Sequence, residues 1–142
     1  MGVVINKVVE GNLIDVSSLP DKVFAEKMLG DSIAYKPKNG LIYSPVDGEV
    51  TMIFPTGHAV GIKMDDGMEV LIHVGINSVN LKGKGFITFV KDGDKVKKGD
   101  RLLGFDLKVL SDNNINDSVI VILTNGGVFK TDLLKRVKIC HE

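Results

Sequence analysis

"GHAVGIKMDDGMEVLIHVG", residues 57–75, contains two aliphatic runs on either side of the dipeptide Asp66-Gly67. Asp-Gly is typical of tight β-turns because both residues accept the positive φ angles that such turns require. The stretch therefore predicts two antiparallel strands joined by a short hairpin. It also holds His58 and His73, two of the three histidines in the chain.

The same pattern extends along the chain and predicts an antiparallel all-β fold. Further turn dipeptides are Asn39-Gly40, Asp47-Gly48, Asp92-Gly93 and Asn125-Gly126. Short runs rich in β-branched and aliphatic residues, which are typical of strands, are Leu41–Tyr43, Val70–Ile72 and Val119–Ile122. Capping signals predict three short helical segments: a two-turn helix over 22–29 that ends at Gly30, a turn after Asp106, and a last helix capped by Thr131-Asp132 and running through Leu133, Leu134 and Val137.

Length and composition favour one soluble domain, residues 1–142, in the cytoplasm. Lys+Arg and Asp+Glu are balanced at 18 each, which is unlike the basic footprint of a nucleic-acid binder. The lone Cys140 cannot form an internal disulfide, so a reducing compartment fits best. The longest aliphatic run, 119–123, is far too short to span a membrane, so we expect no membrane insertion.

The two histidines are expected on one side of the hairpin. If Asp66 and Gly67 are the two central turn residues, His58 faces Gly75; if the loop comprises 64–67, His58 faces His73 directly. Because side chains alternate along a strand, either even-numbered loop places both imidazoles on the same face. An odd-numbered loop without a bulge would separate them.

Neighbouring neutral imidazoles have two chemical uses. With an ordinary pKa near 6.5, each offers a nitrogen lone pair at neutral pH, as a nucleophile or as a metal ligand. We expect the Thr56 hydroxyl to orient His58. The Gly75 carbonyl is expected to accept from Nδ1 of His73, which leaves Nε2 as the exposed nucleophile. The alternative is two half-buried histidines satisfied by backbone groups, with Thr56 and Gly75 serving only as turn residues.

Longer stretches of the chain resemble the glucose-type IIA domains of the bacterial phosphoenolpyruvate-dependent sugar phosphotransferase system. The stretches that carry the resemblance, within roughly residues 12–126, are "LPDKVFAEKMLGDSIAYKP", "SPVDGEV", "FPTGHAVGI", "GMEVLIHVGINSVNLKGKGF", "DGDKVKKGDRLLGFDL" and "VIVILTN". The resemblance implies a flattened antiparallel β-sandwich or barrel with short helical turns. It also implies a phosphohistidine carrier, which is a phosphotransferase component that takes a phosphoryl group from the protein HPr and passes it to a IIB domain during sugar uptake.

Carried over residue by residue, the resemblance makes His73 the phosphorylated residue, His58 its hydrogen-bonding helper and Thr56 the residue behind that helper. No cofactor is required, although some members bind zinc through the same two histidines and a carboxylate of a partner protein. Regulatory targets are a further class of partner. The docking surface that the resemblance implies around the histidines consists of Val23, Phe24, Phe54, Leu71 and Val79.

The chain also departs from the family pattern. Asn77 and Leu71 stand where members usually have Asp and often have Phe, respectively. The C-terminal stretch "VFKTDLLKRVKICHE" differs from the expected final hairpin and ends early. We therefore expect an atypical, shortened C-terminus whose open sheet edge is covered by the last helix or by a second chain.

Three other functions compete with the carrier. A biotinyl- or lipoyl-like domain would be modified on a turn lysine, here Lys63. This lysine is not flanked by methionine on both sides, as is usual in such domains. A zinc hydrolase related to the M23 peptidases would need a third ligand, for which only His141 and Cys140 are candidates. The third alternative is a non-catalytic regulatory domain that keeps the fold and binds transporters.

Overall fold

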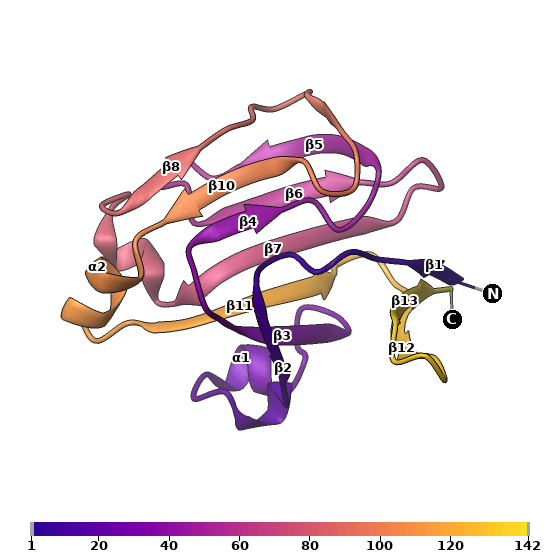
Figure 1. Ribbon diagram of the computed structural model, residues 1–142, viewed down its shortest axis with the longest axis horizontal. Helices are drawn as coiled ribbons and strands as arrows, with labels where there is room; N and C mark the ends of the chain where they lie inside the picture. Colours follow the sequence, from indigo (N-terminus) through magenta and orange to yellow (C-terminus); the bar gives the residue numbers. More distant parts are fainter. Residues whose placement is uncertain (1, 142) are drawn as a thin grey trace.

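The computed structural model describes residues 2–141, which fold into an antiparallel β-sandwich with short helices (Figure 1). The strands are β1 (Gly2–Val4), β2 (Gly11–Ile14), β3 (Ser32–Pro37), β4 (Leu41–Tyr43), β5 (Gly48–Ile53), β6 (Ala59–Lys63), β7 (Glu69–Ile76), β8 (Phe86–Thr88), β9 (Lys95–Val96), β10 (Arg101–Phe105), β11 (Asn116–Leu123), β12 (Val128–Thr131) and β13 (Val137–Cys140). The helices are α1 (Lys22–Ala25), α2 (Leu107–Asp112) and the 3₁₀ segments η1 (Val16–Ser18) and η2 (Ser78–Leu81).

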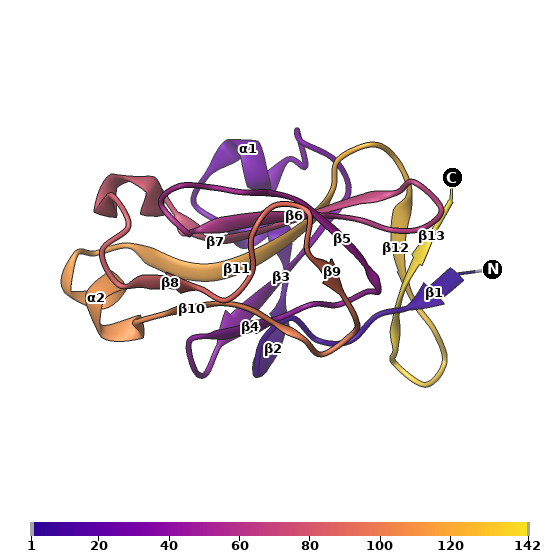
Figure 2. The same cartoon turned by 90° about the horizontal axis from the view of Figure 1, so that it is seen from above.

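The strands form three open sheets. The large sheet has the order β2-β3-β11-β7-β6-β5-β9, and the sheet β4-β10-β8 lies against it. The third sheet, β1-β13-β12, lies at one end of the molecule (Figure 2). Among the described residues every strand pair is antiparallel, as the sequence predicts.

Alternation along β11 divides the apolar residues between two cores. Val121 points into the main core between the large sheet and β4-β10-β8. Ile120 and Ile122 point to the opposite face, where Val16 of η1 and Phe24 of α1 cover them. Each aliphatic side chain buried in this way contributes roughly 1.5–3 kcal/mol. The second core matters for the site because it fixes α1 against the outer face of the large sheet.

The predicted turn dipeptides lie in loops or, for Asp47-Gly48, at the start of β5, and among the described residues only one of them closes a hairpin between paired strands. Asp66-Gly67 lies between β6 and β7. The loop there has five residues, 64–68, because the Met64 N–H donates to the Met68 carbonyl at 2.8 Å and the Asp66 carboxylate accepts from the Met68 N–H at 3.0 Å. Both registers predicted for this hairpin are therefore wrong, and His73 pairs with Ala59.

The helical predictions were partly correct. α1 begins after Asp21, whose side chain accepts from the Val23 N–H at 2.8 Å. It ends at Ala25 rather than continuing to residue 29, because Lys27 adopts a left-handed φ of 54°. α2 follows Asp106 as expected, with Asp106 as its N-cap. No helix within residues 2–141 has the length and apolarity needed to cross a bilayer.

The predicted C-terminal helix is wrong: the final segment is the hairpin β12–β13. Asp132 directs its carboxylate to the turn rather than to a helix, accepting from the backbone N–H groups of Leu134 and Arg136 at 3.0 and 2.9 Å. β1 then pairs with the other edge of β13. The expectation that the C-terminal stretch departs from a final hairpin is also wrong, because residues 128–140 form one.

Candidate functional site

His58 and His73 lie side by side on the outer face of the large sheet. Their ring centroids are 5.0 Å apart, and the rings meet edge to face at 79°. His73 belongs to β7 and is partly exposed, whereas His58 precedes β6 and is only 3% exposed. The structure thus brings together the two imidazoles that the sequence singles out.

The rings meet for a reason that differs from the predicted one. In the observed register Ala59 opposes His73, so strict alternation would place His58 on the other face. His58, however, lies in a bend outside β6, directly after Gly57, whose φ is +75°. A residue at such a bend is released from strand alternation, and its side chain turns toward His73.

Thr56 contacts His58 in the way the sequence predicts. Thr56 Oγ1 and His58 Nδ1 are 2.5 Å apart. The β5–β6 turn holds this contact, since the Gly57 N–H donates to the Phe54 carbonyl at 2.7 Å. The contact engages Nδ1 and leaves Nε2 as the ring nitrogen of His58 that is available to other groups.

His73 is held uncharged by its surroundings. Burial, together with the neighbouring His58, lowers its pKa from 6.5 to about 4, and the Gly75 backbone and Asp21 act weakly in the opposite direction. Burial lowers the pKa of His58 as well. Both rings are therefore neutral near pH 7, which is the state in which an imidazole nitrogen is a nucleophile or a ligand.

The predicted contact between His73 and the Gly75 backbone is present, since it raises the pKa of His73, but at Nδ1 it does not meet strict hydrogen-bond geometry. Among the described residues, Nδ1 of His73 is the buried side-chain atom without a hydrogen-bond partner. Nε2 is not buried in this way, so it is the nitrogen of His73 that other molecules can reach.

Aromatic rings enclose the histidine pair. The Phe24 ring is centred 5.0 Å from that of His73, and the Phe54 ring is 5.2 Å from that of His58. Phe86, at the start of β8, is centred 6.4 Å from His58 and was not predicted to lie at the site. Its place is set by the pairing of β8 with β10, a long-range contact that no local pattern indicates.

The other residues predicted for a docking surface differ in exposure. Val23 and Val79 are 40% and 51% exposed. Leu71 is partly buried against the second core, so it supports the sheet as well as the surface. Asn77 is exposed and adopts a left-handed φ of 62°, and its side chain makes no cap hydrogen bond to η2.

The described residues provide no complete metal site of their own. Within residues 2–141 no three His, Cys, Asp or Glu side chains converge in a way that could hold a metal ion. His141 instead lies 3.4 Å from Asp66, at the far end of the β6–β7 hairpin. The two site histidines could supply two ligands, and any others would have to come from outside this part of the chain.

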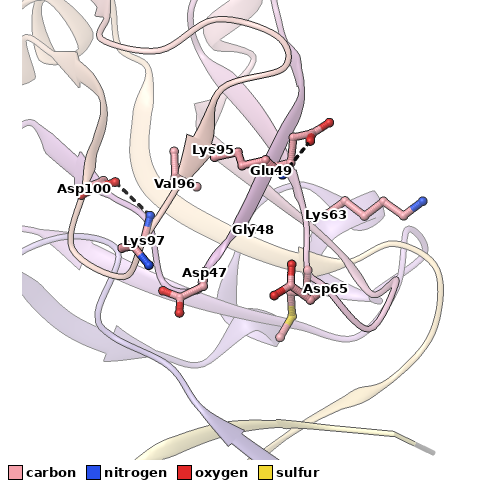
Figure 3. A pocket seen from close by; sticks show the side chains of 10 residues that line it. Asp47, Gly48, Glu49, Lys63, Asp65, Lys95, Val96, Lys97 and Asp100 are labelled. Atoms are coloured by element: carbon pink, nitrogen blue, oxygen red, sulfur yellow. Dashed lines mark hydrogen bonds and ion pairs between the residues drawn. The ribbon is translucent and has the colours of Figure 1, made fainter.

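Lys63, the lysine considered for modification, lines a separate charged groove. Figure 3 shows this groove of about 500 Å³ between β5, β9 and the end of β6. Its lining mixes acidic side chains with lysines. Lys95 lies 3.6 Å from Glu49, and the Asp100 carboxylate accepts from the backbone N–H of Lys97 at 2.9 Å. No histidine lines this groove, so it is distinct from the histidine site.

Comparison with known protein families assigns the chain to one of them. Residues 3–128 match the family described as phosphoenolpyruvate-dependent sugar phosphotransferase system, EIIA 1. The chain therefore belongs to this family of EIIA proteins, as the resemblance in its sequence implies.

Two relatives and two solved structures agree with this assignment or with the fold. The chain is 47% identical over 115 residues to the PTS system glucose-specific EIIA component of Halalkalibacterium halodurans, covering 81% of the chain and 66% of that protein. It is 42% identical over 130 residues to the PTS system glucose-specific EIIA component of Oceanobacillus iheyensis, and the match covers 92% of the chain and 76% of that protein. Glucose permease IIA from Mycoplasma capricolum superposes with a TM-score of 0.85 at 34% identity, and the match covers 96% of the chain and 92% of that structure. Helicobacter pylori Csd3 shares the fold alone, with 18% identity, a TM-score of 0.53 and coverage of 87% and 31%.

Proposed function

We propose that this chain is a phosphohistidine carrier that accepts a phosphoryl group from HPr on His73 and passes it to a IIB domain of a sugar transporter. The observation that supports this most strongly is the histidine pair, with its centroids 5.0 Å apart, in a chain of the EIIA family. The proposal places the reaction in the cytoplasm, a reducing compartment that suits a chain with one cysteine.

The nucleophile in this proposal is Nε2 of His73. Because the His73 pKa is about 4, the ring is neutral at physiological pH and its lone pair is available. The bond between phosphorus and its donor atom on HPr breaks as the bond to Nε2 forms. In the transfer to the IIB domain His73 is the donor: the bond between phosphorus and Nε2 breaks as a bond to the acceptor atom of the IIB domain forms. No nucleotide is consumed, and the carrier is regenerated.

Thr56 and His58 would stabilise the phosphorylated state. When the Thr56 hydroxyl donates to Nδ1 of His58, the ring proton of neutral His58 resides on Nε2. That N–H is then a donor for an oxygen of the phosphoryl group on His73. Preorganised donors aimed at developing phosphoryl charge are a major source of rate enhancement in phosphoryl transfer.

The partners would dock on the apolar surface around the rings. Phe24 and Phe54 flank the two histidines. Val23, which precedes Phe24 in α1, is 40% exposed, and the proposal extends the surface to Val79 of η2, which is 51% exposed. Exposed apolar residues gathered around a reactive group are typical of a protein-docking surface. Docking would exclude water from His73 during transfer, which strengthens the electrostatic contribution of His58.

Zinc at His58 and His73 is a secondary proposal that needs a partner. Neutral imidazoles are good zinc ligands, but zinc sites usually have four ligands and the described chain offers two here. We therefore expect isothermal titration of the purified chain with zinc to show no tight site. Tight binding that disappears in H73A would show that the chain supplies a complete site.

The function is tested by transfer of labelled phosphate from phosphoenolpyruvate through enzyme I and HPr. We expect wild type and the control variant H141A, which lies outside the site, to be labelled equally, and H73A to remain unlabelled. A labelled HPr that fails to label wild type would favour the non-catalytic regulatory domain. Intact-protein mass spectrometry of the same sample tests the Lys63 alternative, which requires an acid-stable lipoyl or biotinyl mass.

A further inference from the structure

The tip of the β12–β13 hairpin exposes two neighbouring leucines. Leu133 is 102% and Leu134 is 72% exposed, the highest exposures among the large apolar residues of the described chain. The turn is ordered by Asp132, which accepts from the Leu134 and Arg136 N–H groups and pairs with the Arg136 guanidinium at 2.7 Å. The leucines are thus presented by a structured turn.

Basic residues surround these leucines. Residues 128–141 contain four Lys or Arg and one Asp, a net charge of +3, so the rest of the neutral chain carries −3. Lys130 and Lys138 are directly opposed in the β12–β13 ladder, and the one nearby carboxylate of the hairpin, Asp132, lies 3.9 Å from Lys138 and is already shared with Arg136, so the pair keeps an excess of positive charge. The lysine side chains cannot lie on the other face of the hairpin, because Phe129 and Ile139 pack there against the main core.

The opposed lysines border a shallow hollow on the outer face of this sheet. The hollow, of about 300 Å³, is lined by Lys130, Thr131, Asp132, Lys138, His141 and neighbouring backbone. Figures 1 and 2 show β12 and β13 at one end of the molecule and α2 at the opposite end. The β5–β6 loop that carries His58 lies toward the α2 end, so an object bound to the hairpin leaves the histidine site open.

We propose that the β12–β13 hairpin binds the surface of an anionic lipid membrane. Leu133 and Leu134 enter the headgroup–acyl boundary, and Lys130, Lys135 and Lys138 contact lipid phosphates. Surface binding by this combination scales with buried apolar area and with attraction to anionic lipids. A second copy of the chain is a poorer occupant, because it would bring two +3 hairpins together. The proposal does not depend on phosphotransfer.

Vesicle flotation of the full chain tests this proposal. The vesicles are phosphatidylcholine with or without phosphatidylglycerol, at low and high salt. We expect binding to the anionic vesicles that weakens with salt and falls about tenfold or more in L133S/L134S, because two leucine side chains leave the interface. K130Q/K135Q is expected to reduce binding to vesicles that contain phosphatidylglycerol and to leave any binding to pure phosphatidylcholine vesicles unchanged. Matched controls are L13S, at a leucine that is 48% exposed on β2, and K38Q/K91Q, at exposed lysines elsewhere.

Thermal melting of L133S/L134S is measured in parallel and is expected to match wild type, since both leucines are exposed. Wild type that does not float with anionic vesicles would overturn the proposal. So would flotation that L133S/L134S retains in full. A dimer in sedimentation velocity that L133S/L134S abolishes, without vesicle binding by wild type, would assign the hairpin to a second copy instead.

Discussion

Replacing His73 with Gln should remove a large part of the pH dependence of stability. In the folded chain the pKa of His73 is about 4, and 6.5 is its ordinary value. Between these values the unfolded chain binds more protons than the folded chain, so the free energy of unfolding falls as the pH is lowered. H73Q lacks the titrating ring and so lacks this contribution.

The magnitude follows from the same two values. Linkage gives a loss of about 2 kcal/mol for wild type between about pH 7 and about pH 5, rising to about 3 kcal/mol below about pH 4. The upper part of the window is preferable because most carboxylates stay ionised there. A loss of about 2 kcal/mol is a substantial share of the ~5–15 kcal/mol that stabilises a typical domain.

Urea unfolding of wild type and H73Q at both pH values measures this difference, with H141A as a control for an exposed histidine. We expect wild type to lose about 2 kcal/mol more than H73Q, and H141A to behave as wild type. Equal losses in wild type and H73Q would refute the conclusion that the folded state holds the His73 ring neutral.

Three further substitutions test the surroundings of the histidines. F24A should raise the pKa of His73 from about 4 toward 6.5, because water reaches the ring that Phe24 now covers; NMR titration measures it, with F89A as the control. T56V should slow phosphoryl transfer roughly tenfold or more in the labelled-phosphate assay, because His58 loses its orienting contact. G75A should cost roughly 1–3 kcal/mol in urea unfolding, because φ is +79° and a Cβ would lie 3.1 Å from the Asn116 carbonyl.

Each of these outcomes has a contrary result. An unchanged His73 titration in F24A would mean that Phe24 does not shield the ring. Full transfer activity in T56V would mean that His58 needs no orienting hydroxyl. G67A is the matched control for G75A, since Gly67 has a φ of +92° but no atom within 4 Å of an added Cβ; equal losses in the two variants would exclude crowding as a cause.

The sequence was sufficient for the fold class because turn dipeptides and alternating apolar runs are local signals. It did not predict the β6–β7 register, since loop length depends on Asp66 capping the Met68 N–H and on the Met64–Met68 hydrogen bond. The proximity of His58 and His73 was predicted from an incorrect register. It is the bend after Gly57 that restores this proximity, and only three-dimensional structure reveals it.

The C-terminal segment shows why local capping signals can mislead. Thr131-Asp132 reads as a helix N-cap, and Leu133, Leu134 and Val137 have spacing compatible with one helical face. In the structure Phe129 and Ile139 bury themselves against the main core as strand residues, and Asp132 caps a hairpin turn. Burial of these two side chains in the tertiary structure therefore outweighs the helix-capping preference of one residue. Phe86 was missed at the site for the same reason, since β8 reaches His58 only through its pairing with β10.

The atom that carries the phosphoryl group tests the central claim most directly. The chain, labelled with ¹⁵N at histidine and phosphorylated through enzyme I and HPr, can be examined by phosphorus–nitrogen and proton–nitrogen correlation NMR. We predict that phosphorus couples to Nε2 of His73 and that Nε2 of His58 carries a proton. Phosphorus on Nδ1 of His73, on His58, or on neither histidine while HPr is phosphorylated would contradict the account.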